Sequence, residues 1–207
     1  MTVVYTVGHS NHADQAFMKL LHDNGITAIA DVRSSPYSRF NPQFNRESLI
    51  GALRNAGIAY VFLGAELGAR SEDAGCYESG KVQYDRLAST ELFRRGLDRV
   101  VEGSRTYRVA LMCAEKDPLD CHRTILVARH LIDRDVEVRH ILADGVVETH
   151  DDALRRLLQA LSLPEQDMFR SRAEVIEDAY LIRGRAIAYD RDASGGAHID
   201  VAGGEGT

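Results

Sequence analysis

Short apolar runs alternate with amphipathic segments along the first three quarters of the chain. The runs at residues 3–7 and 107–112 are mostly apolar, which is typical of buried strands. The segments between such runs repeat apolar residues at helical spacing, as do Phe17, Leu20 and Leu21, which would lie on one helix face. This alternation predicts βαβ units, and hence an α/β fold with a mainly parallel sheet and helices on both of its faces.

The same pattern sets the extent of each expected element. We expect strands at residues 3–7, 27–32, 58–63, 107–112 and 136–142, and helices at residues 13–23, 46–56, 90–102, 121–133 and 151–161. Gly25 and Gly57 follow two of these helices, where a glycine commonly ends a helix. Residues 1–162 are therefore expected to form a single domain.

Pro164 interrupts the pattern. Residues 163–192 are amphipathic, so we expect a helical extension that packs on the domain or on a second subunit, in which case the protein would be a homodimer. Residues 193–207 are rich in glycine, which predicts a disordered tail.

Composition narrows the class of protein. Of the 207 residues, 44% are hydrophobic and 27% are charged, as in ordinary globular domains. No apolar run approaches the roughly 20 residues that cross a bilayer, and the first residues lack the pattern of a signal peptide. Three cysteines in a chain of this length do not suggest a disulfide framework. We therefore expect a cytoplasmic protein with no membrane partner.

Charge is unevenly distributed along the chain. The net charge of −6 argues against a general nucleic-acid coat, yet residues 33–70 contain five arginines and two acidic residues. This basic stretch is either a solvated face or a contact face for nucleic acid.

The densest group of reactive residues follows the strand expected at 107–112. Cys113 and Glu115 come directly after that strand, and Cys121, His122 and Arg123 stand where the next helix begins. Ligands of open α/β sheets bind at the carboxyl ends of the strands, so this turn predicts a site. The helix dipole there favours a Cys121 thiolate, whereas His122 and Arg123 suit a bound anion.

Other interpretations of this turn stay open. Seven residues separate Cys113 from Cys121, against two to four in common structural zinc sites, and Leu119 stands where a Cys-x5-Arg phosphatase loop requires arginine. A metal ion held by Cys113, Cys121 and His122 is one alternative, and buried inert cysteines are another. We expect His130, His140 and His150 at the surface or as helix caps rather than as ligands.

The first strand ends in Gly8-His9-Ser10-Asn11. Backbone N–H groups that open a helix can hold an anion, and His9 and Ser10 would then point into the crevice above the sheet. Alternatively, Ser10 or Asn11 caps the following helix.

The second strand ends at Asp31, on the same edge of the sheet as His9. Arg33 and Arg39 follow it, interleaved with aromatic residues, and could bind phosphate and stack a base. The alternative is that Asp31 and Arg33 form an ion pair that only fastens the loop.

In combination, these motifs resemble the family catalogued as domain of unknown function 488. The resemblance covers about residues 4–142 and implies a Rossmann-like α/β domain with a pocket built from the shared motifs. The residues that carry it are Gly8-His9-Ser10, Asp31-Val32-Arg33 with Ser38-Arg39, Gly57 to Tyr60, Leu63-Gly64 with Leu67-Gly68, and Cys113-Ala-Glu115 with Cys121-His-Arg123. Ile187 to Tyr189 is similar to the closing segment of many members. The family name assigns no reaction.

The leading hypothesis is an enzyme that acts on a phosphate-bearing small molecule, a nucleotide or a nucleic-acid end. Its candidate substrate-binding residues are Ser10, Arg33, Arg39 and Arg123, and its candidate catalytic residues are His9, Asp31, Glu115, Cys121 and His122. The alternatives are a non-catalytic nucleic-acid-binding module and a metal-dependent hydrolase or sensor. A rhodanese-like sulfur carrier is disfavoured, because the acidic residues beside the cysteines do not suit a persulfide.

Overall fold

The computed structural model describes residues 2–194, which form a six-stranded sheet in the order β3-β2-β6-β1-β7-β8. The first five strands in that order are mutually parallel, and β8 is antiparallel to β7. The strands are β1 (Thr2–Gly8), β2 (Ala28–Asp31), β3 (Ala59–Phe62), β6 (Val109–Cys113), β7 (Val136–Ile141) and β8 (Val147–Thr149). The predicted α/β fold with a mainly parallel sheet is confirmed.

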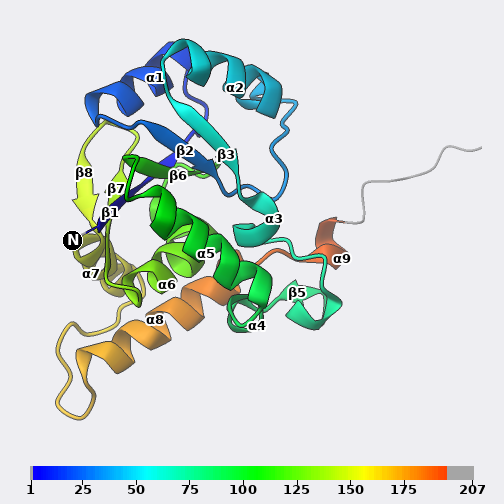
Figure 1. Cartoon of the computed structure of the whole chain (residues 1–207). Coiled ribbons are helices and arrows are strands. Elements are labelled where there is room, and N and C mark those ends of the chain that lie inside the picture. The colour runs from blue at the N-terminus through cyan, green and yellow to red at the C-terminus, as the bar shows by residue number, and fades with distance from the viewer. Residues whose placement is uncertain (1, 195–207) are drawn as a thin grey trace, which may run out of the picture.

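Helices cover both faces of the sheet (Figure 1). Helices α1 (Asp14–Asp23) and α2 (Arg46–Asn55) pack on one face, while α5 (Glu91–Gly103) and α6 (Arg129–Ile132) pack on the other. The apolar side chains of strand β6 pack against the helices on both faces of the sheet. Its side chains alternate between them: Val109, Leu111 and Cys113 join the α5 side, and Ala110 and Met112 join the α1 side.

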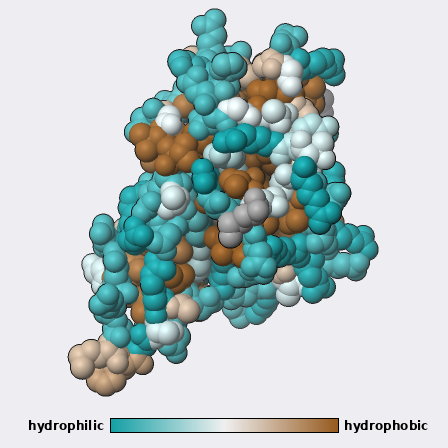
Figure 2. Space-filling view, turned by 60° about the vertical axis from the view of Figure 1, so that its left-hand side comes forward, coloured by the Kyte–Doolittle hydropathy of each residue, from teal (hydrophilic) through white to brown (hydrophobic). Residues whose placement is uncertain are grey.

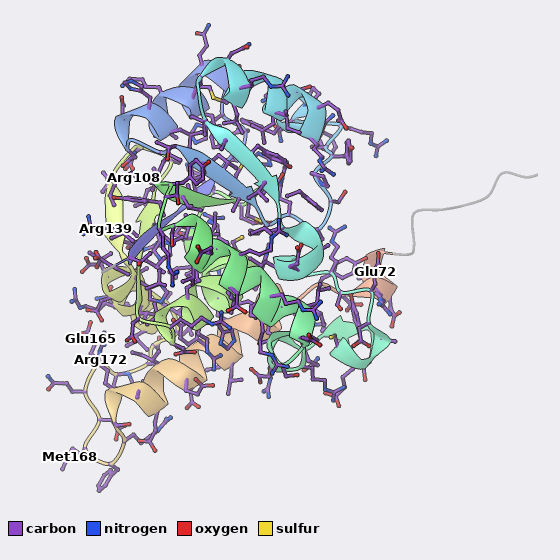
Figure 3. The ribbon with its side chains drawn as sticks, in the orientation of Figure 1. Glu72, Arg108, Arg139, Glu165, Met168 and Arg172 are labelled. Atoms are coloured by element: carbon purple, nitrogen blue, oxygen red, sulfur yellow. The ribbon has the colours of Figure 1, made fainter. Side chains whose placement is uncertain are left out.

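A third cluster of buried residues joins the C-terminal segment to the domain. Helix α7 (His150–Ala160) and helix α8 (Arg172–Ile187) pack together, and α8 begins with a capping box between Ser171 and Glu174. The loop between the two helices projects from the body, with Met168 at its tip (Figure 3). Apart from residues 193 and 194, which belong to α9 (Arg191–Ser194), the predicted tail lies outside the described residues.

Several short elements escaped the sequence pattern because they are too short to show a period. They are α3 (Gly64–Leu67), α4 (Tyr84–Ala88), the hairpin of β4 (Tyr77–Glu78) and β5 (Lys81–Val82), and the 3-10 turns η1 (Pro42–Phe44), η2 (Ala74–Cys76) and η3 (Pro118–Asp120). The helix expected at 121–133 starts as a π-helix, η4 (Arg123–Ala128), and continues as α6. Residues 189–191, which lead into α9, run along the hairpin (Figure 1).

The surface placement expected for His140 and His150 is wrong. Both are buried in a chain of hydrogen bonds that runs from Thr6 Oγ1 to His140 (2.8 Å), on to His150 (3.0 Å), and from there to the Tyr180 hydroxyl (2.7 Å). Burial lowers the pKa of His150 to about 4, so its ring is neutral near pH 7. Histidine is tolerated in this part of the core because each ring finds polar partners there.

Hydrophilic residues predominate on the face shown in Figure 2, with several apolar areas among them. Among the described residues, no helix is both long and apolar enough to cross a membrane.

Candidate active site

Strands β1 and β6 lie side by side at the centre of the sheet, and Gly8 pairs with Cys113 at their carboxyl ends. The chain leaves β1 toward α1 on one face, and it leaves β6 toward η4 and α6 on the other. Such a reversal opens a crevice at the edge of an α/β sheet, where ligands of this fold class bind. The structure thus has a topological switch point where the sequence predicted the site.

A pocket of about 230 Å³ lies on the β6 side of this edge. Its walls come from the ends of β2 and β6, the start of the helix after β6, helix α4 and the segment that follows α8. The lining residues are Arg33, Ser34, Ser35, Ala69, Arg70, Tyr84, Cys113, Ala114, Glu115, Asp120, Cys121, His122, Ile187 and Tyr189.

Cys121 caps the helix that follows β6. Its carbonyl oxygen accepts hydrogen bonds from the N–H groups of Thr124 (3.1 Å) and Ile125 (3.2 Å), so it stands at the N-terminal end of the helix. The Arg123 N–H donates to its sulfur at 3.4 Å, as it would to the side-chain oxygen of an ordinary N-cap residue. The sulfur therefore occupies a position that favours a thiolate, as the sequence predicted.

Three further side chains converge on that sulfur. Nδ1 of His122 lies 3.7 Å from the Sγ atoms of both Cys113 and Cys121. Nε2 of His122 lies 3.0 Å from the carbonyl oxygen of Val32, which fixes the ring orientation. A carboxylate oxygen of Glu115 lies 2.9 Å from the Cys121 sulfur.

These contacts shift the protonation equilibria of the group. Burial opposes ionisation of Cys121, but the hydrogen bond from Cys113 and the positive charges of Arg123 and His122 bring the pKa of its thiol well below the usual value. Burial, followed by the charge and hydrogen bond of Cys121, raises the pKa of the Glu115 carboxyl. Burial likewise raises the pKa of the Cys113 thiol. The environment therefore favours ionisation of the Cys121 thiol over that of Cys113.

Arg33 is held in place by a buried network behind the pocket wall. Its guanidinium forms a two-pronged ion pair with Asp31 at 2.7 and 2.9 Å, and it donates to Nε2 of His9 at 3.2 Å. The Tyr60 hydroxyl donates to the same carboxylate at 2.9 Å. The ion pair considered in the sequence analysis is present, and it sets the direction of an arginine that lines the pocket.

His9 itself does not line the pocket. It is 3% exposed, is stacked on Phe44, and bonds through Nδ1 to the carbonyl oxygen of Ser10. Burial and the nearby Arg33 charge outweigh the Ser10 hydrogen bond and lower the pKa of His9 to about 4. A neutral His9 accepts the hydrogen bond from Arg33, so it orients the Arg33 side chain from outside the pocket.

Arg123 is fully buried, and its guanidinium supports the loop between Cys113 and Cys121. It donates to the carbonyl oxygens of Glu115 (2.8 Å) and Lys116 (3.3 Å). That loop crosses the end of β1 so closely that only a glycine fits at Gly8, where a Cβ would lie 1.9 Å from the Glu115 oxygen. The packing of this loop thus explains Gly8 and Arg123, which belong to two of the motifs shared with the family.

The remaining predicted residues lie elsewhere. Ser10 lines a separate pocket with Lys116 and Asp117, and Arg39 is exposed on the loop after β2. Ser10 and Asn11 do not cap α1, whose N-cap residue is Ala13, so that alternative is wrong.

Arg70, Tyr84 and Tyr189 line the pocket but were not singled out as site residues by the sequence. The Arg70 guanidinium lies 4.5 Å from the centre of the Tyr189 ring, a cation–π distance. Tyr84 belongs to the short helix α4, which left no periodic signal. Tyr189 carried a signal, since the segment that ends with it resembles the closing segment of family members.

Together, the sheet and its pocket define a Rossmann-like α/β protein with a composite site at the switch point. The family model described as "Domain of unknown function DUF488" matches residues 13–130, more than half of the chain. The chain belongs to that family. A comparison with curated proteins found no match.

Proposed function

We propose that the protein is an enzyme whose switch-point pocket binds the phosphate-bearing end of a small molecule, a nucleotide or a nucleic acid. The convergence of Glu115, Cys121 and His122 with two arginines in one pocket carries this proposal. At about 230 Å³ the pocket is smaller than the roughly 300–1,000 Å³ of sites that enclose a whole ligand. It therefore suits the reacting end of a substrate better than the entire molecule.

The two arginines would have different roles. Asp31 compensates the charge of Arg33, so Arg33 would contribute directed hydrogen bonds to a phosphate rather than net positive charge. Within residues 2–194 the Arg70 guanidinium forms no ion pair, which leaves its charge available for a phosphate. At the floor of the pocket, Glu115 would act as a proton acceptor, because its carboxylate lies at hydrogen-bond distance from Cys121.

Arg70→Ala should weaken binding of inorganic phosphate and of adenosine monophosphate about 10-fold or more, since a hydrogen bond to a charged group contributes roughly 1.5–3 kcal/mol. Titration calorimetry on the full chain measures this change. Arg105→Ala is the matched control, because Arg105 pairs with Glu102 on the surface after α5 and does not line the pocket. Equal affinities in the two variants, or no saturable binding in the wild type, would contradict the proposal.

A nucleic-acid contact face along residues 33–70 has less support. Arg33 is buried and paired with Asp31, while Arg39 and Phe40 are exposed on a loop outside the pocket, so Arg33 is not available to such a face. A cytoplasmic location fits the proposal, because Cys76, Cys113 and Cys121 are free thiols and the pocket uses two of them in that state.

A further inference from the structure

Cys113, Cys121 and His122 have the arrangement of three ligands of one metal ion. Their ligand atoms, the two Sγ atoms and Nδ1, lie within 4.8 Å of one another, and all three residues are buried. Among residues 2–194 they are the one group of three or more such side chains that meets this condition.

The distances agree with a tetrahedral ion. A Zn²⁺ ion with Zn–S bonds of about 2.3 Å and Zn–N bonds of about 2.0–2.1 Å holds sulfur and nitrogen roughly 3.6 Å apart. Both sulfur–nitrogen distances here are 3.7 Å. Two thiolates and an imidazole form a donor set that favours zinc over hard cations such as magnesium.

The surroundings of His122 support this geometry. Its Nε2 can only donate to the Val32 carbonyl, so in the neutral ring Nδ1 carries the lone pair that faces both sulfurs. Metal-bound histidines usually make such a hydrogen bond with their other nitrogen, because it fixes the ring for coordination. The ring is therefore already oriented as a ligand.

The long spacing between the cysteines has a structural explanation. Cys113 ends β6 and Cys121 precedes the next helix, so the loop between them leaves the sheet edge and returns to it. Arg123 holds that loop through two carbonyl oxygens, which keeps both sulfurs at the pocket floor.

We propose that Cys113, Cys121 and His122 bind a single Zn²⁺ ion whose fourth position faces the pocket and Glu115. Three protein ligands with one open position are typical of catalytic zinc, whereas structural sites are closed by four. This inference deepens the proposed function, because the ion would lie in the pocket proposed to bind phosphate. Binding would displace the protons of the thiols.

The test is zinc binding by the untagged full chain, measured by elemental analysis and by competition with a chromogenic chelator. We expect one zinc per chain, and at least about 100-fold weaker binding in Cys113→Ala, Cys121→Ala and His122→Ala, since even indirect partners contribute 10–100-fold. Cys76→Ala is the matched control: Cys76 is also a buried free thiol, but it lies outside the group. Substoichiometric zinc, or unchanged affinity in the three variants, would overturn the proposal.

A second measurement on the wild type does not depend on whether the variants fold. Zinc should protect Cys113 and Cys121 from alkylation, as mapped by mass spectrometry, and leave the labelling of Cys76 unchanged. Equal labelling with and without zinc would overturn the metal site. Zinc binding without any phosphate binding would instead contradict only the proposed function, and phosphate binding without zinc would contradict only the metal site.

Discussion

Asp31→Ala should lower the free energy of unfolding by about 3–5 kcal/mol, because it leaves the buried Arg33 guanidinium without a counter-charge. Both side chains are almost inaccessible, at 0% exposure for Asp31 and 5% for Arg33. The substitution also removes the acceptor of the Tyr60 hydroxyl and of the Arg33 N–H. For a chain of this size, the loss corresponds to a fall in melting temperature of roughly 10 °C.

Asp98→Ala is the matched control for that measurement. Asp98 also forms an ion pair with an arginine, Arg134, but its side chain is 70% exposed. An exposed pair contributes about 0–1 kcal/mol, so this variant should melt close to the wild type. If the two variants melt alike in calorimetry, the Asp31 network does not have the structural role assigned to it.

Gly8→Ala should destabilise the protein by about 2 kcal/mol or more, because the added Cβ would lie 1.9 Å from the Glu115 carbonyl oxygen. Either β1 or the loop that carries Glu115 would have to move, and Arg123 fastens that loop from the other side. The substitution should therefore impair the pocket as well as the fold. Denaturant unfolding measures the first effect.

Gly51→Ala provides the comparison for Gly8→Ala. Gly51 lies within α2, and no atom would meet its Cβ within 4 Å. Its replacement should leave stability unchanged or raise it by up to about 1 kcal/mol, since alanine is the better helix former. A Gly8 variant as stable as the Gly51 variant would refute the close crossing of the loop over β1.

Much of the fold could be predicted from the sequence because its strands and helices are long enough to show a period. The order of the strands could not. Placing β6 between β1 and β2 depends on which face each crossover covers, and a hydrophobic pattern does not distinguish the faces. The buried His140 and His150 also escaped prediction, since their hydrogen-bond partners come from distant segments.

The edge of the sheet at which the pocket lies was predictable, but the residues that line the pocket were not all predictable. The rule that ligands bind at the carboxyl edge placed Asp31, Arg33 and the cysteine turn at one edge of the sheet. In the structure Arg33 and the cysteine turn line one pocket, and Asp31 is paired with Arg33. The sequence could not show that His9 stands behind Arg33, or that Arg70 would reach the pocket from a later loop. Both facts depend on tertiary packing, which no local spacing encodes.

The most direct test of an enzymatic role is to measure whether the protein consumes phosphate compounds. The full chain is incubated with a panel of nucleotides and sugar phosphates, and the loss of each compound is followed by mass spectrometry. At least one compound that binds should be consumed.

Glu115→Gln should slow the consumption of that compound by about 10²–10⁴-fold, the usual contribution of a general acid or base. Glu165→Gln, which changes an exposed acid on the loop before α8 (Figure 3), should have no effect. Binding without consumption, or equal rates in the two variants, would contradict the account.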